Sequence, residues 1–232
     1  GDVLRIAAVP PVVVNAISVS GHVHRDTMFP YRSGLRIADV IADADELRPN
    51  ADLRYVVIRR EAPVDRSVSV ISADLEAAWR DPASPANVPL QARDQIVVFD
   101  LESGRERQLQ PILADLRRQA ARGAPSRIVA IQGTVPAPGD YPLEPGMRVA
   151  DLIRAGGGLG EAALAGQAEI TRFELTDTEG RRSRTETIDL AKALDGDPTA
   201  NLELRPYDYL VIKNVPNWGP QAVVTLVGEV RY

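Results

Sequence analysis

The stretch VAIQGTVPAPGDYPLEPGMRVADLIRAGGGL, residues 129–159, decides the fold. It begins with an apolar β-type run that ends in Gly-x-Val at Gly133, and a Pro-Gly turn follows. Its second half has helical periodicity, because Val149, Leu152 and Ile153 share one face. Three glycines come next. Glycine-rich turns beside helices often hold phosphate groups, so the first possibility to examine is a nucleotide-binding loop.

The glycines do not match the motifs of nucleotide-binding loops. A dinucleotide fingerprint requires Gly-x-Gly-x-x-Gly after a strand and at the start of a helix. Here Gly156 and Gly157 come after the helical segment, and Gly158-Leu-Gly160 is followed by Ala163 where a third glycine is needed. The chain also lacks the Gly-Lys-Ser/Thr of a P-loop. We therefore predict that these glycines end the helix and supply its left-handed C-cap residue.

The order of elements in this stretch is repeated along the chain. Three apolar runs end in Gly-x-Val, with their glycines at Gly21, Gly133 and Gly228. Before each of them lies a strand of alternating apolar residues that opens with an aspartate, namely Asp2, Asp94 and Asp208. Residues 34–44 parallel the helical segment 146–156, and a strand that reaches an arginine follows each of them. Each module therefore reads as strand, turn, short strand, helix, strand, strand, short helix and strand. This pattern predicts an α+β fold of the β-grasp type, in which a mixed sheet wraps one main helix.

The repeat divides the chain into five parts. They are the end of a preceding module (1–14), a first module (15–103), a linker helix (104–125), a second module (126–217) and the start of a further module (218–232). The linker is expected to be amphipathic, with these residues on one face: Leu109, Ile112, Leu113, Leu116 and Ala120. Pro111 suits its first turn and Gly123 its C-terminal cap. We expect the helix to pack on its own module, with a contact between subunits as the alternative.

The composition excludes or disfavours several classes of binding and catalytic site. The 232 residues carry a formal charge of -5, which does not favour a general nucleic-acid or anionic-membrane binder. The absence of cysteine excludes disulfides, thiolate nucleophiles and sulfur-ligated metals. No apolar run approaches the roughly 20 residues of a membrane helix. The chain starts with glycine and shows no signal peptide, so we interpret it as a fragment of a longer protein.

Catalytic and metal-binding motifs are weak. His22 and His24 are two residues apart on a predicted strand, which puts both imidazoles on one face and allows the beginning of a metal site. A solvated pair is the favoured interpretation, because the chain has no other histidine. Carboxylate pairs lie in polar, turn-like surroundings, and no Gly-x-Ser-x-Gly elbow occurs. We therefore expect a protein that is not an enzyme, without catalytic residues, metal ligands or cofactors.

Three residues are candidates for ligand contact. Trp218 lies in a Pro/Gly-rich linker and is the best aromatic candidate for stacking on a sugar, with a packing anchor between modules as the favoured alternative. Arg59 and Arg172 lie where corresponding strands of the two modules end. Arginine-rich strand ends of this kind are suited to an acidic polymer, and solvated surface arginines are an equal alternative.

Residues 129–159 resemble the signature of the SLBB (soluble-ligand-binding β-grasp) family. The matching residues are Gly133, Val135, Pro138, Gly139, Tyr141, Gly146, Leu152, Ala155, Gly156 and Gly157. The resemblance is weaker in the first module, where HRDTMFPYRSG replaces Pro-Gly-x-Tyr. Physically, Pro138-Gly139 makes a tight turn and Gly133 permits a close backbone approach or a bulge, which are roles in forming the fold. The fold implied is two tandem β-grasp-like SLBB modules joined by an amphipathic helix, with strands of flanking modules at both termini.

The resemblance also implies a function. Tandem modules of this kind are typical of outer-membrane polysaccharide export proteins, in which they pack around a ring that encloses a channel. The expectation is therefore a periplasmic part of a capsule or exopolysaccharide translocon, without a membrane span of its own. Its partners would be further copies of the same protein, the polysaccharide and an inner-membrane polysaccharide copolymerase. The alternative is a β-grasp module that binds a saccharide or small ligand and has no channel role.

Overall fold

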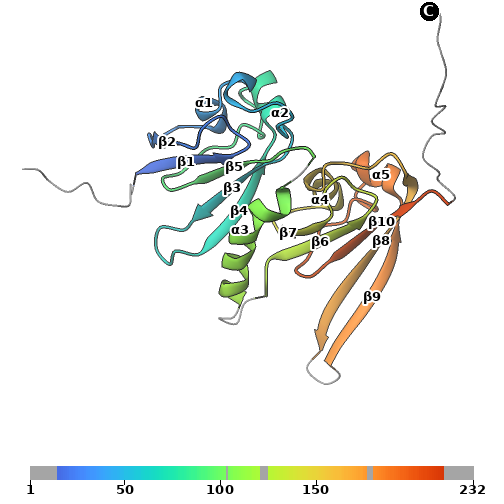
Figure 1. Ribbon diagram of the computed structural model, residues 1–232. Coiled ribbons are helices and arrows are strands. Elements are labelled where there is room, and N and C mark those ends of the chain that lie inside the picture. The colour runs from blue at the N-terminus through green and yellow to red at the C-terminus, as the bar shows by residue number, and fades with distance from the viewer. Residues whose placement is uncertain (1–14, 103, 121–124, 177–179, 217–232) are drawn as a thin grey trace, which may run out of the picture.

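The computed structural model describes residues 15–102, 104–120, 125–176 and 180–216. These residues form two modules with a helix between them, as Figure 1 shows. The first module contains, in chain order, β1 (Ala16–Gly21), β2 (Thr27–Pro30), α1 (Ile37–Val40), a 3-10 helix (Ala44–Glu46), β3 (Val56–Glu61), β4 (Val68–Ala73), α2 (Leu75–Arg80) and β5 (Gln95–Val98). Helix α3 (Arg105–Ala120) follows. The second module contains β6 (Ile128–Gly133), β7 (Gly139–Pro142), α4 (Val149–Ala155), β8 (Ala163–Thr176), β9 (Gly180–Ile188), α5 (Leu190–Leu194) and β10 (Tyr209–Asn214).

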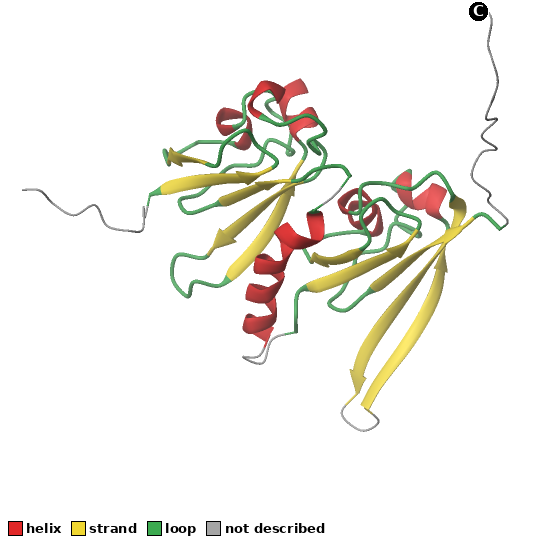
Figure 2. Cartoon of the chain, in the orientation of Figure 1, coloured by secondary structure: helices red, strands yellow, loops and turns green. Residues whose placement is uncertain are grey.

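The two modules have the same sheet topology. The strand order is β2-β1-β5-β3-β4 in the first and β7-β6-β10-β8-β9 in the second. In each sheet the first and last strands of the module are parallel central neighbours, β1 with β5 and β6 with β10, and the other pairs are antiparallel. Helices lie beside mixed sheets in both modules (Figure 2), so the predicted α+β class and its tandem arrangement are confirmed. The expected strands of flanking modules, at residues 1–14 and 218–232, lie outside the described residues.

The Gly-x-Val glycines lie where the two parallel central strands come closest. Gly21 and Gly133 have φ angles of +97° and +89°, in the left-handed region. A Cβ at Gly133 would lie 2.0 Å from the carbonyl oxygen of Ile212 on β10, and one at Gly21 would lie 2.2 Å from that of Val98 on β5. Any side chain would push the strands apart, so each module requires glycine here.

The glycines after α4 end that helix. Gly157 has a φ angle of +88° and donates its N–H to the carbonyl of Arg154, while Gly158 donates to the carbonyl of Ile153 at 2.9 Å. These two bonds are those of a Schellman motif, which satisfies carbonyls that the helix leaves without partners. The expected helix stop is therefore present, and these backbone N–H groups are directed to the helix itself.

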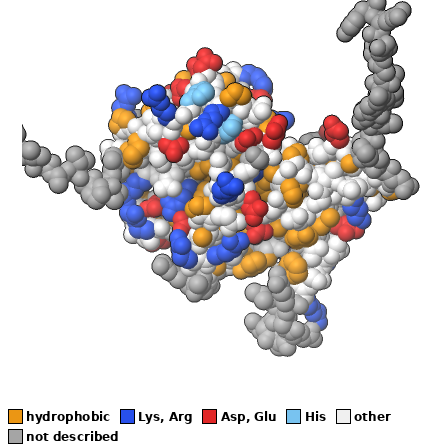
Figure 3. All heavy atoms as spheres, viewed as in Figure 1, with side chains coloured by type: hydrophobic (Ala, Val, Ile, Leu, Met, Phe, Trp, Pro, Cys, Tyr) orange, Lys and Arg blue, Asp and Glu red, His pale blue; other side chains and the backbone are white. Residues whose placement is uncertain are grey.

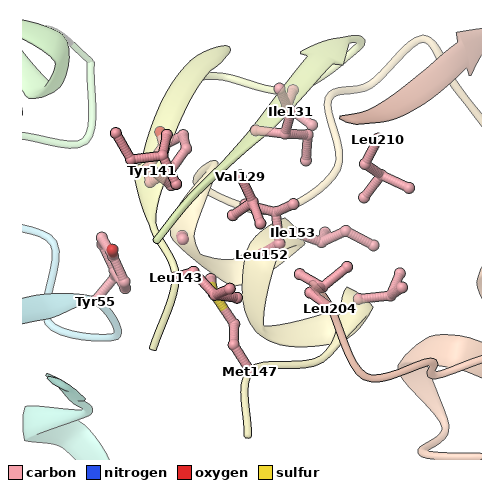
Figure 4. Packing of buried hydrophobic residues seen from close by; sticks show 14 of the residues in the cluster. Tyr55, Val129, Ile131, Tyr141, Leu143, Met147, Leu152, Ile153, Leu204 and Leu210 are labelled. Atoms are coloured by element: carbon pink, nitrogen blue, oxygen red, sulfur yellow. The ribbon is translucent and has the colours of Figure 1, made fainter. Parts of the chain in front are cut away.

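The hydrophobic core of the second module extends into the first module. Tyr141 on β7 is buried, donates its hydroxyl to the Ala137 carbonyl at 2.6 Å, and meets the ring of Tyr55 from the first module edge-on at 6.1 Å. Figure 4 shows Tyr55 beside the side chains of Tyr141 and Leu143. Burial raises the pKa of Tyr141 to about 12, so the hydroxyl stays protonated and remains a donor at neutral pH. The modules therefore share one continuous core at this junction.

Helix α3 lies between the modules. Its predicted apolar face is buried in the shared core through Leu109, Ile112, Leu113 and Leu116. Pro111 is at the seventh position of the helix, so the prediction that it lies in the first turn is wrong. The helix begins earlier because Arg105, its first residue, is buried and anchored by tertiary contacts. These contacts hold the preceding turns helical although Pro111 cannot donate to its fourth preceding carbonyl.

The predicted cap Gly123 lies outside the described residues. Among the helices that the structure describes, α3 is the longest, and none of them has both the length and the apolar character needed to cross a membrane.

Candidate functional site

An ion pair between a buried aspartate and a half-buried arginine occurs at the same place in both modules. Asp94 and Asp208 directly precede β5 and β10, and both carboxylates are buried. Arg60 donates to both oxygens of Asp94, at 2.9 and 2.7 Å, and Arg172 approaches Asp208 at 3.3 Å. The repetition indicates a role in the fold, because burying a carboxylate requires a nearby cation and hydrogen-bond donors.

Each carboxylate also orders the turn before its strand. Asp94 accepts the backbone N–H of Gln91 at 2.7 Å, and Asp208 accepts that of Arg205 at 2.9 Å. These turns contain Arg93 and Tyr207, which have φ angles of +72° and +69°. A residue other than glycine rarely adopts this conformation, so the surrounding hydrogen bonds have to hold it.

The structure therefore shows that the Arg172 side chain is bound to residues of its own module. Besides its ion pair with Asp208, it donates to the Glu203 carbonyl at 2.8 Å. Arg59 is also bound within the molecule: it donates to Asp115 on α3 at 2.9 and 2.6 Å and to Glu61 at 3.0 Å. Trp218 lies outside the described residues. The three sequence candidates are not brought together into one site by the described part of the chain.

Arg59 lines a pocket of about 650 Å³ between the β3–β4 hairpin and α3. Two further arginines of the pocket also have acidic partners, since Arg66 lies 2.8 Å from Glu61 and Arg118 pairs with Asp115. Positive and negative side chains are interspersed over the first module on the face shown in Figure 3. The acidic partners offset the charge of these arginines, so the pocket is not a strongly basic surface.

The two histidines do not lie on a strand, so this part of the prediction is wrong. Strand β1 ends at Gly21, and both histidines follow it in a bend, although the N–H of His22 still donates to the Val98 carbonyl of β5 at 2.8 Å. The Nε2 atom of His22 lies 2.6 Å from the Pro49 carbonyl oxygen, while His24 is exposed. Within the described ranges, no three histidine or carboxylate side chains come together as a metal site would require.

A buried tertiary contact between the modules centres on Arg105. Its side chain is 3% exposed and lies 2.5 Å from the Asp52 carboxylate of the first module. It also donates to the Ala155 carbonyl at the end of α4, in the second module. The guanidinium carbon lies 5.6 and 5.3 Å from the ring centroids of Tyr55 and Phe99. One cation on the connecting helix therefore binds both modules.

Side chains of α3 and the second module also cover the edge strand β4 of the first. The Gln119 amide accepts the N–H of Val68 at 2.5 Å and donates to its carbonyl at 3.0 Å. Glu144 accepts from the N–H and the hydroxyl of Ser72, at 2.6 and 2.9 Å. Arg154 on α4 adds a bond to the Arg54 carbonyl at 2.8 Å. These bonds protect the edge of β4 and connect the first module to α3 and to the second module.

We expect the stability of this junction to depend on the protonation of Glu144. Burial raises the pKa of Glu144 above its ordinary value of 4.5, although the Ser72 hydrogen bonds and Arg154 lower it. The folded protein then holds a proton more tightly than the unfolded chain, so its stability falls as the pH rises above about 4.5 and levels off above the folded-state pKa.

We expect the free energy of unfolding of the wild type, relative to that of Glu144→Gln, to fall as the pH rises from about 4.5 to the folded-state pKa of Glu144. Urea denaturation of both proteins between about pH 4 and pH 8 measures it; a relative gain of wild-type stability with rising pH would contradict it.

Sequence reasoning missed an aromatic group beside the second sheet. Tyr207, Tyr209 and Phe173 line a pocket of about 480 Å³, together with residues at the C-terminal part of α3. The three residues come from two strands and a turn, and no local sequence pattern groups them. An alignment of the two modules could have identified them, because the corresponding residues of the first module are not aromatic; they are Arg93, Gln95 and Glu61.

Comparison with known protein families identifies the modules. The sequence model of the SLBB domain matches residues 16–72 and 128–184. The matches begin at β1 and β6 and end within β4 and β9, so each covers the corresponding part of one module. No curated protein matches the chain. The SLBB domain is a ligand-binding β-grasp domain, and this chain carries two SLBB domains in tandem.

Proposed function

We propose that the chain is the periplasmic part of an exporter of capsular or extracellular polysaccharide. In this proposal, several copies of the full-length protein pack side by side into a ring. Their SLBB domains form part of the wall of a channel that passes polysaccharide to the outer membrane, and an inner-membrane copolymerase delivers the polymer. The polymer moves through a hydrated pore, so the proposed mechanism makes and breaks no covalent bonds and uses no cofactor.

The observation that carries the proposal is the rigid connection between the two SLBB domains. The buried Arg105–Asp52 pair, the shared core and the bonded edge of β4 connect the described parts of the two domains at three places. A ring closes only if each subunit presents its contact surfaces in a fixed orientation, because a flexible joint would allow open or irregular assemblies. Two rigidly joined domains per subunit meet this requirement.

Electron microscopy of the full-length protein, purified in detergent, tests the channel role. We expect closed rings with a central opening, and weaker association for the 232-residue chain alone, because contacts around a ring reinforce one another. The 232-residue chain at the same concentration is the control. Monodisperse single subunits of the full-length protein would contradict the proposal.

A second candidate is a saccharide-binding module without a channel role. The observation that favours it is the pocket that contains Tyr207, Tyr209 and Phe173, because aromatic rings beside polar side chains suit a ligand with both apolar and hydroxyl-bearing surfaces. A receptor of this kind gives saturable glycan binding while the full-length protein remains a single subunit. The sequence candidate Trp218 provides a further comparison, since Trp218→Ala weakens binding if that ring contributes.

A further inference from the structure

The pocket of the second module combines aromatic and polar side chains. Tyr209 opens β10 with 37% of its surface exposed, and Tyr207 in the preceding turn is 40% exposed. The Tyr207 hydroxyl accepts the backbone N–H of Ser126 at 3.1 Å, which fixes the orientation of its ring. Phe173 on β8 lies two residues beyond Thr171, the cross-strand neighbour of Tyr209, and so on the same face of the sheet. Three rings therefore converge on one pocket.

The fold does not require these rings. The first module has the same strand order, the same arginine–aspartate ion pair and a left-handed residue at the same place before the last strand. At the positions of Tyr207 and Tyr209 it has Arg93 and Gln95, and at the position of Phe173 it has Glu61. Since one module folds with polar residues at these places, the aromatic residues of the other serve a purpose beyond folding.

The surrounding sheet face is also unlike its counterpart. In the first module, Val57, Val68 and Val70 face α3 and are buried in the shared core. By strand register, their counterparts in the second module are polar; they are Glu169, Ser183 and Thr185. Ser183 and Thr185 are exposed. The face with the aromatic pocket is therefore open in the described part of the chain, and its polar residues do not suit a second apolar helix.

The polar groups of the pocket suit hydroxyls and carry little net charge. Asp140 pairs with Arg117 on α3 at 2.8 Å, and Asp208 pairs with Arg172. Ser126 and Asp208 each have a buried side-chain oxygen without a hydrogen-bond partner among the described residues. Aromatic rings attract the C–H faces of sugar rings, while carboxylates and hydroxyls bond the sugar hydroxyls. An anionic ligand gains little here, because acidic and basic groups offset one another.

We infer that this pocket is a binding site for a neutral saccharide, with a sugar ring stacked on Tyr209 and Phe173 and its hydroxyls directed to Ser126, Asp140 and Asp208. The inference rests on the proposed function, because it assumes that the chain handles polysaccharide, and it assigns the contact to one face of the second module. The pocket volume of about 480 Å³ is in the range of small-ligand sites and accommodates part of a polymer chain.

Titration of the 232-residue chain with neutral oligosaccharides tests the site. The probes are cellotetraose and maltotetraose, with tetragalacturonate as the anionic comparison, followed by two-dimensional amide NMR. We expect saturable binding of a neutral probe in the millimolar range, with shifts at Ser126, Ala130 and Tyr209. Tyr209→Ala weakens it about fivefold or more, since a stacked ring is lost. Tyr209→Phe retains it, because the ring remains.

Gln95→Ala is the matched control, since Gln95 occupies the corresponding exposed position of the first module, and it leaves binding unchanged. Circular dichroism confirms that each variant is folded. Absence of binding by both neutral probes, preference for tetragalacturonate, or binding unaffected by Tyr209→Ala overturns the inference. These outcomes are independent of the ring experiment: rings without saccharide binding at this site refute the site alone, and binding without rings refutes the channel role alone.

Discussion

Replacing Arg105 with leucine is expected to lower the free energy of unfolding by about 3–5 kcal/mol, the range for removing one partner of a buried ion pair. The change leaves the Asp52 carboxylate in the core without its cation, although Asp52 still accepts the N–H groups of Arg54 and Tyr55. The Ala155 carbonyl also loses a donor. Urea denaturation, followed by circular dichroism, measures the effect.

Arg107→Leu is the matched control, because Arg107 is an exposed arginine on the same helix. Its effect is expected to lie within about 0.5 kcal/mol of zero. The double variant Arg105→Leu/Asp52→Leu removes both charges and should recover part of the loss. Equal effects of Arg105→Leu and Arg107→Leu would show that the buried pair does not hold the modules together.

Replacing Gly133 with alanine is expected to cost about 3 kcal/mol or more, at the upper end for a single substitution. The new Cβ would lie 2.0 Å from the Ile212 carbonyl oxygen, a backbone atom that cannot rotate away. The positive φ of Gly133 adds strain for any residue with a side chain. Strands β6 and β10 would have to separate, and they are the centre of the second sheet. Thermal unfolding followed by circular dichroism detects the loss.

Gly166→Ala serves as the control for this substitution. Gly166 is also in the second module, and an added Cβ there meets no atom within 4 Å. Alanine in a strand restricts the unfolded chain more than glycine does, so Gly166→Ala is expected to be neutral or slightly stabilising. Similar losses for Gly133→Ala and Gly166→Ala would mean that the close approach of β6 to β10 is not what requires glycine.

Much of the fold was predictable because its signals are local and occur twice. The Gly-x-Val runs correctly predicted strands β1 and β6, and the periodicity of residues 146–156 correctly predicted helix α4. The apolar face of α3 followed from the spacing of Leu109 and Leu116 with their neighbours. The error at Pro111 arose because proline is usually confined to a first helical turn, whereas here tertiary anchoring of Arg105 extends the helix before it.

The candidate sites were less predictable because they depend on contacts distant in sequence. Arg59 and Arg172 look alike as arginines at strand ends, yet one pairs with Asp115 on α3 and the other with the buried Asp208. The aromatic pocket joins Ser126, Phe173 and Tyr209, which belong to separate segments of the second module. Strand register sets which side chains become neighbours, and no local pattern encodes that register.

The sequence by itself determined the order of elements, the α+β class, the duplication and the glycines that the fold needs, because short-range periodicity and backbone conformation specify these features. Only the tertiary structure decided which charges are buried, how α3 joins the two SLBB domains and which face of the second sheet stays open. Burial and pairing of Arg105 depend on how two distant segments dock, so its role at the junction is a property of the assembled core.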